Sequence, residues 1–276
     1  MRSLVKFFLL TYIISWSLFI SAAIISRNAN SPDSEFSPAG YFIYLIGVFA
    51  PALVAVFLSW REERKAGVLA LLSKIFKAPT YLGWYIFAIG YFATVKLLAA
   101  VVYRIAIGQW PLFGHEAFYI IVAGIIFSTP MQAGEEIGWR GFALPRMANR
   151  FGIAGASVIL GIIWAAWHLP FFFLHGADKF GQSFPVYLLS VVALSVAMAW
   201  LYWRTHGSLM LTMLMHAAVN NTTGIVPSAS LGAVNPFSLN ASPIAWISTA
   251  FMWLFAFYFL IQMRGVKIEV DERLQH

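Results

Sequence analysis

Two adjacent carboxylates and an arginine stand at the end of an apolar stretch of this sequence. Glu135 and Glu136 follow the apolar run 117–133 almost directly, and Arg140 comes four residues after Glu136. Ionisable groups in a bilayer are costly and usually face a cavity, a partner or a substrate. On a helix, Glu136 and Arg140 share one face, whereas Glu135 points about 100° away from Glu136. We therefore expect Glu135 to be the acid free for chemistry. The competing interpretation is an acid–base cluster at the membrane border.

Two later apolar segments also carry polar side chains. His168 stands in Trp164-Ala-Ala-Trp-His-Leu-Pro, and His216 precedes Asn220 by four residues, so that these two share a helix face. Each group alone also fits a structural role between neighbouring helices. As a set they fit hydrolysis, since a carboxylate and an imidazole around one water form a general base. A second imidazole and an amide can then donate to an oxyanion.

The same residues permit a metal site. Two histidines and a glutamate, here His168, His216 and Glu135, are a zinc ligand set. Zn is therefore the one cofactor that the residue types suggest. The spacing does not decide between metal-free and zinc-dependent chemistry.

Composition predicts a polytopic membrane protein. Of 276 residues, 61% are hydrophobic and 11% are charged, whereas soluble domains are nearer 45–50% apolar. The absence of cysteine excludes disulfides, thiolate metal sites and a cysteine nucleophile. The net charge of +7 comes from basic residues that flank apolar runs. We therefore expect a lipid bilayer and no nucleic acid as a partner.

The apolar runs predict the fold. A span needs about 20 apolar residues, and eight runs qualify: 5–25, 40–60, 82–103, 117–135, 153–174, 185–203, 207–223 and 243–263. We predict an all-α polytopic membrane protein, a single integral membrane domain over 1–276, with its motif-bearing core at 117–223. The first run also resembles a signal peptide with a cleavage site near Ser21-Ala-Ala, but its length favours a retained span.

Basic residues predict the orientation. With a cytoplasmic N-terminus, thirteen basic residues lie on the cytoplasmic side and three on the other. The thirteen are Arg2, Lys6, Arg61, Arg64, Lys65, Lys74, Lys77, Arg146, Arg150, Arg204, Arg264, Lys267 and Arg273; the three are Arg27, Arg104 and Lys179. The positive-inside rule favours eight spans with both termini cytoplasmic, in the inner membrane if the source is bacterial.

Two further segments carry expectations of their own. The linker 61–79 has the apolar periodicity of an amphipathic helix lying on the inner leaflet. Lys96 lies inside a predicted span, where it either snorkels to the interface or lines a cavity. Counting along the spans places Glu135, His168 and His216 at similar depth, by about 1.5 Å per residue, so that we expect them to converge.

Other classes of intramembrane hydrolase are excluded because their sequence motifs are absent. A His-Glu-x-x-His zinc helix is absent, because Tyr119 stands where His115-Glu116 would need a second histidine. A Gly-x-Ser-Gly nucleophile is absent, since Val158 follows Gly155-Ala-Ser157. None of the predicted spans contains aspartate, which excludes a paired-aspartate protease.

The three polar motifs together resemble the CPBP family, the type II CAAX prenyl endopeptidases and bacteriocin-processing (Abi) proteins. Its Glu-Glu-x-x-x-Arg motif is matched by Glu135, Glu136 and Arg140. Its aromatic-x-x-x-His motif is matched by Trp164 and His168, with tryptophan where the family more often has phenylalanine, and its third motif by His216 and Asn220.

This resemblance implies roles for the matched residues. Glu135 and His168 would activate the attacking water, and His216 and Asn220 would stabilise the oxyanion. Glu136 and Arg140 would support the motif helix. The family includes proteins described as metalloproteases, and a metal-free glutamate mechanism is also argued for the type. We favour the metal-free mechanism, because Asn220 is a poor zinc ligand and a good oxyanion donor.

The resemblance also implies a cytoplasm-facing intramembrane cavity and an intramembrane endopeptidase function. Its substrate would be a membrane-tethered peptide or a CAAX-type prenylated protein. Two other functions stay open at this point: a catalytically silent membrane scaffold or immunity protein, and a proton-coupled transporter that uses the same residues as a relay.

Overall fold

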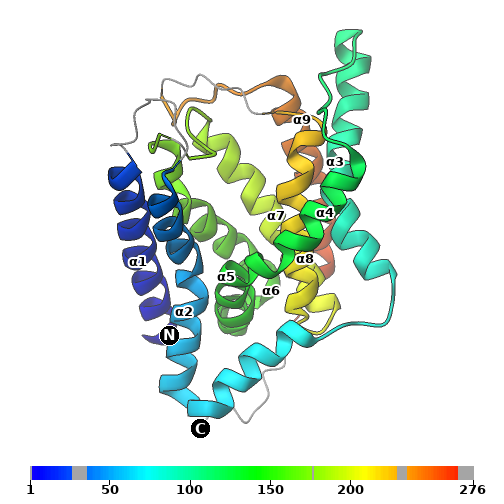
Figure 1. Ribbon diagram of the computed structural model, residues 1–276. Helices are drawn as coiled ribbons and strands as arrows, with labels where there is room; N and C mark the ends of the chain where they lie inside the picture. Colours follow the sequence, from blue (N-terminus) through cyan, green and yellow to red (C-terminus); the bar gives the residue numbers. More distant parts are fainter. Residues whose placement is uncertain (1, 27–35, 176, 229–234, 267–276) are drawn as a thin grey trace.

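The computed structural model describes residues 2–26, 36–175, 177–228 and 235–266, and all regular structure within them is helical (Figure 1). The elements are α1 Arg2–Ser26, α2 Pro38–Ser73, η1 Lys74–Phe76, α3 Gly83–Ile107, α4 Phe118–Ser128, η2 Thr129–Gln132, α5 Ala133–Glu136, η3 Ile137–Ala143, α6 Leu144–Trp167, η4 Leu169–Phe172, α7 Phe184–Arg204, α8 Leu209–Thr222, η5 Thr223–Ile225 and α9 Pro243–Met263. The predicted all-α fold is confirmed.

Six helical runs in the described part of the chain are long and apolar enough to cross a membrane. The predicted spans 117–135 and 153–174 belong largely to one of these runs, Phe118–Trp167, because helical structure continues through the turn between them. The predicted span 207–223 corresponds to α8, which has only 14 residues. The polytopic membrane architecture is confirmed, with six candidate spans in the described residues where eight were expected.

Serine caps begin four of the helices. The residue before each of α2, α7, α8 and α9 is a serine whose hydroxyl accepts a hydrogen bond from a backbone N–H in the first turn. Serine is a favoured N-cap because this bond satisfies an orphan donor of the helix. In α2, α7 and α9 a proline also lies in the first turn, where it needs no N–H.

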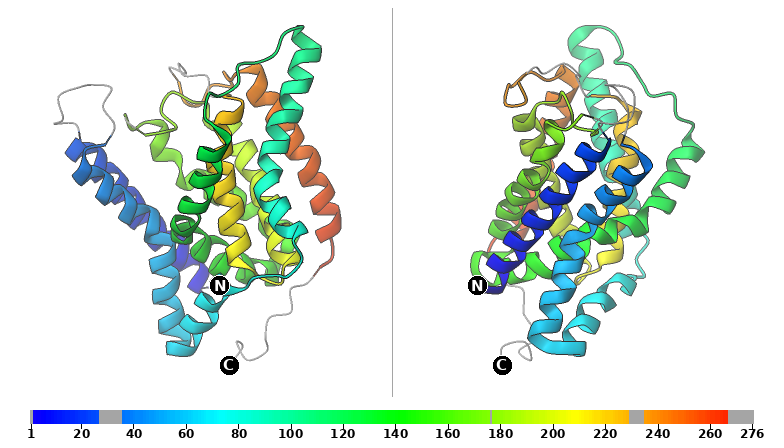
Figure 2. Two further views of the ribbon diagram at one scale, coloured as in Figure 1. Left: turned by 45° about the vertical axis from the view of Figure 1, so that its right-hand side comes forward. Right: turned by 60° about the vertical axis from the view of Figure 1, so that its left-hand side comes forward.

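Helices α1 and α2 form an antiparallel pair along one side of the molecule (Figures 1 and 2). The hydroxyl of Ser15 donates to the carbonyl of Gly47 over 2.8 Å, which ties α1 to α2. The indole of Trp16 donates to the carbonyl of Trp167 over 3.0 Å, which ties α1 to α6. The first predicted span therefore packs as an integral helix of the bundle, next to the element that carries His168.

The expected amphipathic linker is helical but packs differently from the prediction. Helix α2 runs beyond the predicted span and breaks at Arg64, whose φ of 54° lies in the left-handed region. The chain then folds back beneath the bundle (Figure 1). There Leu71 is buried against the glycine position 141, whereas Leu69 and Phe76 are exposed. Some apolar side chains of this segment therefore pack against the protein, and others are exposed on its surface.

The bundle has two distinct ends. We call the end formed by residues 61–82, 144–152 and 204–208 the basic end, because eight of the thirteen basic residues counted above lie in these three segments. Three bonds between described residues join these segments: Arg146 pairs with Glu62 at 3.0 Å, Lys77 donates to the carbonyl of His206, and the hydroxyl of Ser208 donates to the carbonyl of Lys77. We call the opposite end, with the connections 168–183 and 223–242, the loop end. Arg27, Lys267 and Arg273 of the orientation prediction lie outside the described residues.

Candidate active site

The stretch with the two glutamates is an irregular helix in the centre of the bundle. Pro130 lies in the first turn of the short 3₁₀ helix η2, one turn of α-helix follows, and η3 is a π-helix that begins directly after Glu136. All residues from Gly134 to Leu144 are buried. π-Helical turns are rare and concentrate at functional sites. The irregular geometry therefore coincides with the segment that the sequence singled out.

Glycines let this stretch lie against neighbouring backbone. A Cβ on Gly138 would lie 2.6 Å from Cβ of Pro51 and 2.7 Å from its carbonyl carbon and oxygen. A Cβ on Gly134 would lie 3.0 Å from the ring of Phe49. Real Cβ atoms do not approach backbone so closely, so that only glycine fits at 138 without a shift. Helix α2 thereby fixes the depth and rotation of the glutamate-bearing segment.

Glu136 is buried, bonds to both Arg140 and His216, and does not line the cavity described below. Its Oε1 accepts from Nη1 of Arg140 at 2.9 Å, and Nδ1 of His216 lies 2.9 Å from the same atom. Glu136 and Arg140 have no exposed surface. The predicted pairing of Glu136 with Arg140 is confirmed. The bond to His216, from a residue 80 positions away, adds a second function to Glu136, which is to orient that imidazole.

Glu135 points in a different direction and reaches the cavity. Its Oε2 accepts a hydrogen bond from the indole Nε1 of Trp164 over 2.7 Å. Its Oε1 accepts no hydrogen bond from another residue in the described part of the chain. A buried carboxylate with one oxygen fixed and the other open to a cavity is arranged to accept a proton.

The hydrogen bond of His168 decides its tautomer. Its Nδ1 lies 2.8 Å from the carbonyl oxygen of Trp164. A carbonyl oxygen only accepts, so that Nδ1 must carry the proton. In the neutral ring Nε2 is then the unprotonated nitrogen and can accept a proton or a hydrogen bond from water. His168 is thus positioned as a second base at the cavity, which it lines.

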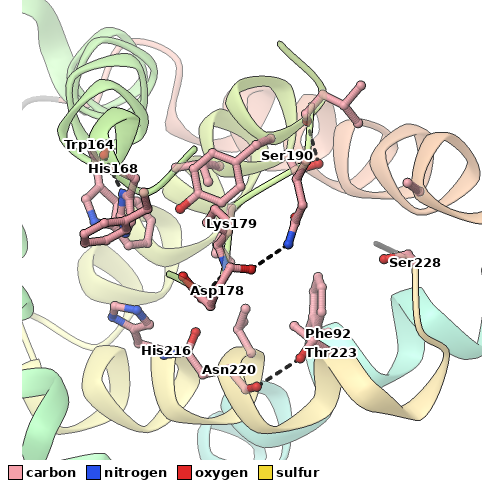
Figure 3. Close-up of a pocket in the computed structure, with 18 of the residues that line it drawn as sticks. Phe92, Trp164, His168, Asp178, Lys179, Ser190, His216, Asn220, Thr223 and Ser228 are labelled. Atoms are coloured by element: carbon pink, nitrogen blue, oxygen red, sulfur yellow. Dashed lines mark hydrogen bonds and ion pairs between the residues drawn. The ribbon is translucent and has the colours of Figure 1, made fainter. Parts of the chain in front are cut away.

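The four predicted catalytic residues line one cavity of about 790 Å³. His168 and His216 face it from one side, and Asn220 lies beside them on α8 (Figure 3). The rings of both histidines pack edge-on against Trp164, with centroid distances of 5.7 Å and 5.3 Å. The expected convergence of Glu135, His168 and His216 is confirmed, because each of them contacts the same indole.

The cavity belongs to the loop half of the molecule. Besides residues in the middle of the bundle, its lining includes the first turns of α2, parts of 178–187 and 219–228, and the start of α9, but no described residue of the basic end. Residues of the basic end were predicted to be cytoplasmic, and the cavity was also expected to face the cytoplasm. These two expectations cannot both hold, because the cavity lies toward the opposite end from the basic residues.

Two residues of the site were not assigned a function from the sequence. Trp164 was recognised only as the aromatic position before His168, although its indole N–H binds Glu135 and its ring lies 4.1 Å from the Arg140 guanidinium carbon. Asn221 was not considered. Its amide donates to the hydroxyl of Ser128 over 2.9 Å and so ties α8 to α4. Its position directly after Asn220 was the one available signal.

The side-chain arrangement does not fit a zinc site. A catalytic zinc needs three protein ligands about 2.0–2.2 Å from one point. Among the described residues, no three His, Cys, Asp or Glu side chains are grouped closely enough to hold a metal ion. Glu135, His168 and His216 therefore do not form the ligand set that their residue types allowed.

Comparisons with known proteins cover this site. Residues 115–222 match the family model described as type II CAAX prenyl endopeptidase Rce1-like, a range that includes every predicted site residue. The chain is also 23% identical over 225 residues to "CAAX prenyl protease 2" of Methanococcus maripaludis, covering 78% of this chain and 81% of the relative. Both findings support the recognition of this chain as a CPBP-type intramembrane protease. The family resemblance inferred from the motifs is confirmed.

These matches support a CAAX-type intramembrane endopeptidase. Such an enzyme accounts for a buried carboxylate and two buried imidazoles around a cavity between apolar helices. The matching family model and the relative are both named for protease activity, which favours the endopeptidase interpretation over the scaffold and transporter alternatives. The individual roles of Glu135, His168, His216 and Asn220 stay predictions.

Proposed function

We propose that this protein hydrolyses a peptide bond of a membrane-tethered substrate with a water activated by Glu135 and His168, without a bound metal. The observation that carries the proposal is the position of Glu135. One of its oxygens is held by Trp164 at 2.7 Å, and the side chain lines a cavity that His168, His216 and Asn220 also line.

The first step is attack by water. Glu135 accepts a proton from the water while the water oxygen bonds to the carbonyl carbon of the substrate. His168 presents the acceptor Nε2, because its Nδ1 donates to a backbone carbonyl, and it thereby orients the same water. The carbonyl oxygen becomes an oxyanion. When the carbon–nitrogen bond breaks, Glu135 returns the proton to the leaving amine.

His216 and Asn220 stabilise the oxyanion in this scheme. Nδ1 of His216 is bonded to Glu136, which leaves Nε2 for the substrate. Nε2 donates only when it carries a proton, and with Nδ1 also protonated the ring is then a cation. The carboxylate of Glu136 at 2.9 Å stabilises this cation. The amide of Asn220 supplies a second donor.

The substrate class follows from the relatives. The matching family and the archaeal relative are both named for CAAX prenyl substrates. We therefore propose that the substrate of this protein is a membrane-anchored peptide. The leading candidate is a peptide with a CAAX-type prenylated C-terminus. A cavity among spanning helices suits such a substrate, since the lipid anchor stays in the bilayer while the peptide enters.

The test is cleavage of tethered peptides by the purified protein, with wild type beside Glu135→Ala and zinc measured on the same samples. The proposal predicts cleavage by wild type, loss of cleavage in Glu135→Ala, and no stoichiometric zinc in either. Zinc that is bound in wild type and lost together with activity would instead establish a metalloprotease.

A further inference from the structure

Lys96 is a buried cation on the far side of the same cavity. It lies in the middle of α3, its side chain is only 2% exposed, and it lines the cavity. Of the two alternatives that the sequence left open, the structure therefore favours a lysine that lines a cavity over one that snorkels to the interface. A lysine is rarely kept in such a place without a partner or a function.

The protein gives Lys96 neutral partners only. Its Nζ donates to the carbonyl of Val226 over 3.1 Å and to the hydroxyl of Ser228 over 2.6 Å. None of the ion pairs between described residues involves Lys96. An ammonium group has three N–H donors, so that one donor and the whole positive charge remain for a ligand. Holding two neutral acceptors does not by itself require a charged side chain.

Its surroundings strengthen binding of an anion. The ring of Phe92 lies 5.5 Å from Nζ, and the side chain is shielded from solvent. Coulomb attraction is several-fold stronger in such a low-dielectric site than in water. An anion that enters the cavity would therefore gain energy by pairing with Lys96, and the unpaired cation would be relieved of its burial cost.

The cavity is long enough to separate this cation from the catalytic groups. Phe92 and Ser228, which contact Lys96, lie on the opposite side of the cavity from His168 and His216 (Figure 3). Thr223, the first residue after α8, lies about 10 Å beyond His216 at 1.5 Å per residue, and Val226 follows three residues later. About three residues of extended peptide cover such a distance.

We propose that Lys96 binds the C-terminal carboxylate of the peptide substrate while the scissile bond lies between Glu135 and His216. This proposal rests on the proposed endopeptidase function. It makes Lys96 a specificity residue that selects chains with a free C-terminus near the cleavage site. A terminal carboxylate is the one anion that every such peptide carries, whatever its side chains.

The experiment compares two farnesylated peptides that differ only in a C-terminal carboxylate or carboxamide. Full-length protein in phosphatidylcholine nanodiscs, which present no net-anionic headgroup, is assayed for kcat/KM on both. Binding of both is measured separately on the Glu135→Gln background, so that it does not depend on turnover. Wild type should prefer the carboxylate by about tenfold or more, since hydrogen bonds to charged groups are the stronger ones.

Variants at position 96 test whether the positive charge of Lys96 causes the preference for the carboxylate peptide. Lys96→Met should reduce the carboxylate preference to about one, and Lys96→Arg should retain most of it. Lys77→Met is the matched control: its ammonium also donates to a backbone carbonyl, that of His206, but lies at the basic end. It should keep the wild-type preference. If Lys96→Met fails to fold, Lys96→Gln is used in its place.

The outcomes separate the two proposals. An equal loss on both peptides in Lys96→Met would show a structural tie and overturn the carboxylate site, as would a wild type without preference. If wild type cleaves neither peptide, the proposed function fails. The binding comparison then still decides whether Lys96 recognises the carboxylate.

Discussion

The indole Nε1 of Trp164 donates a hydrogen bond to Oε2 of Glu135 over 2.7 Å, from a residue 29 positions later in the chain. The same ring lies 4.1 Å from the guanidinium carbon of Arg140 and packs against His168 and His216. Trp164 therefore joins the proposed base to its supporting ion pair. The aromatic-x-x-x-His motif of the CPBP family more often has phenylalanine at this position. Phenylalanine would fill the same space but has no N–H to donate.

Trp164→Phe should lower kcat by about tenfold or more with a small change in KM. The variant loses one hydrogen bond to a charged group, worth about 1.5–3 kcal/mol, but keeps the aromatic packing. Glu135 would then be free to rotate away from the water. Steady-state kinetics on a tethered peptide measure the effect, and an unchanged kcat would mean that the indole N–H does not position the base.

Substitution of Glu135 should mainly reduce cleavage activity, whereas substitution of Glu136 should mainly reduce stability. Glu135→Gln should reduce cleavage by about 100-fold or more, the usual contribution of a general base, and leave thermal stability near that of wild type. Glu136→Gln leaves the buried Arg140 without its counter-charge and should destabilise the protein by about 3 kcal/mol. Thermal unfolding in detergent and activity are measured on both variants. Equal destabilisation by both would contradict the division of roles.

Gly138→Ala should disturb the packing of the glutamate-bearing segment. The added Cβ would meet the backbone of Pro51 at 2.7 Å, and overpacking of this kind costs about 1–3 kcal/mol. Gly90→Ala, in α3, is the matched control, because no atom lies within 4 Å of its added Cβ. We expect Gly90→Ala to be neutral or to stabilise by about 0.5–1 kcal/mol. A melting temperature that falls equally in both variants would argue against the proposed close contact.

Cleavage should persist after metal removal. The proposed proton transfers use only Glu135 and His168, so that dialysis against a zinc chelator should leave kcat within about twofold of the untreated value. Zinc content is measured on the same sample before and after dialysis. Activity that disappears with zinc and returns when zinc is added would reverse this assignment.

The orientation can be tested without background labelling, because the sequence has no cysteine. Phe76→Cys lies at the basic end and Leu239→Cys at the loop end, at positions where the native side chains are 83% and 64% exposed. The positive-inside rule predicts that a membrane-impermeant thiol reagent labels only Leu239→Cys in intact cells. Labelling of Phe76→Cys alone would place the cavity end in the cytoplasm.

Local spacing was sufficient for the pairs within one helix. The i, i+4 relation of Glu136 and Arg140 follows from helical geometry alone, and their ion pair is present even though a π-helix begins between them. The eight apolar runs were found because bilayer thickness fixes the length of a span. Hydrophobicity did not predict that helical structure continues from Phe118 to Trp167, or that α8 has only 14 residues. An apolar run indicates which residues lie in the membrane, but it does not show where helical hydrogen bonding ends.

By itself, then, the sequence determined an all-helical membrane fold, the family, and the small set of residues able to do the chemistry. The tertiary structure decided which glutamate reaches the cavity and which is committed to His216 and Arg140. It also brought Lys96 and Trp164 to that cavity and placed the cavity toward the loop end. These relations join residues up to 132 positions apart. They depend on how helices rotate and pack against one another, which spacing within a single helix does not specify.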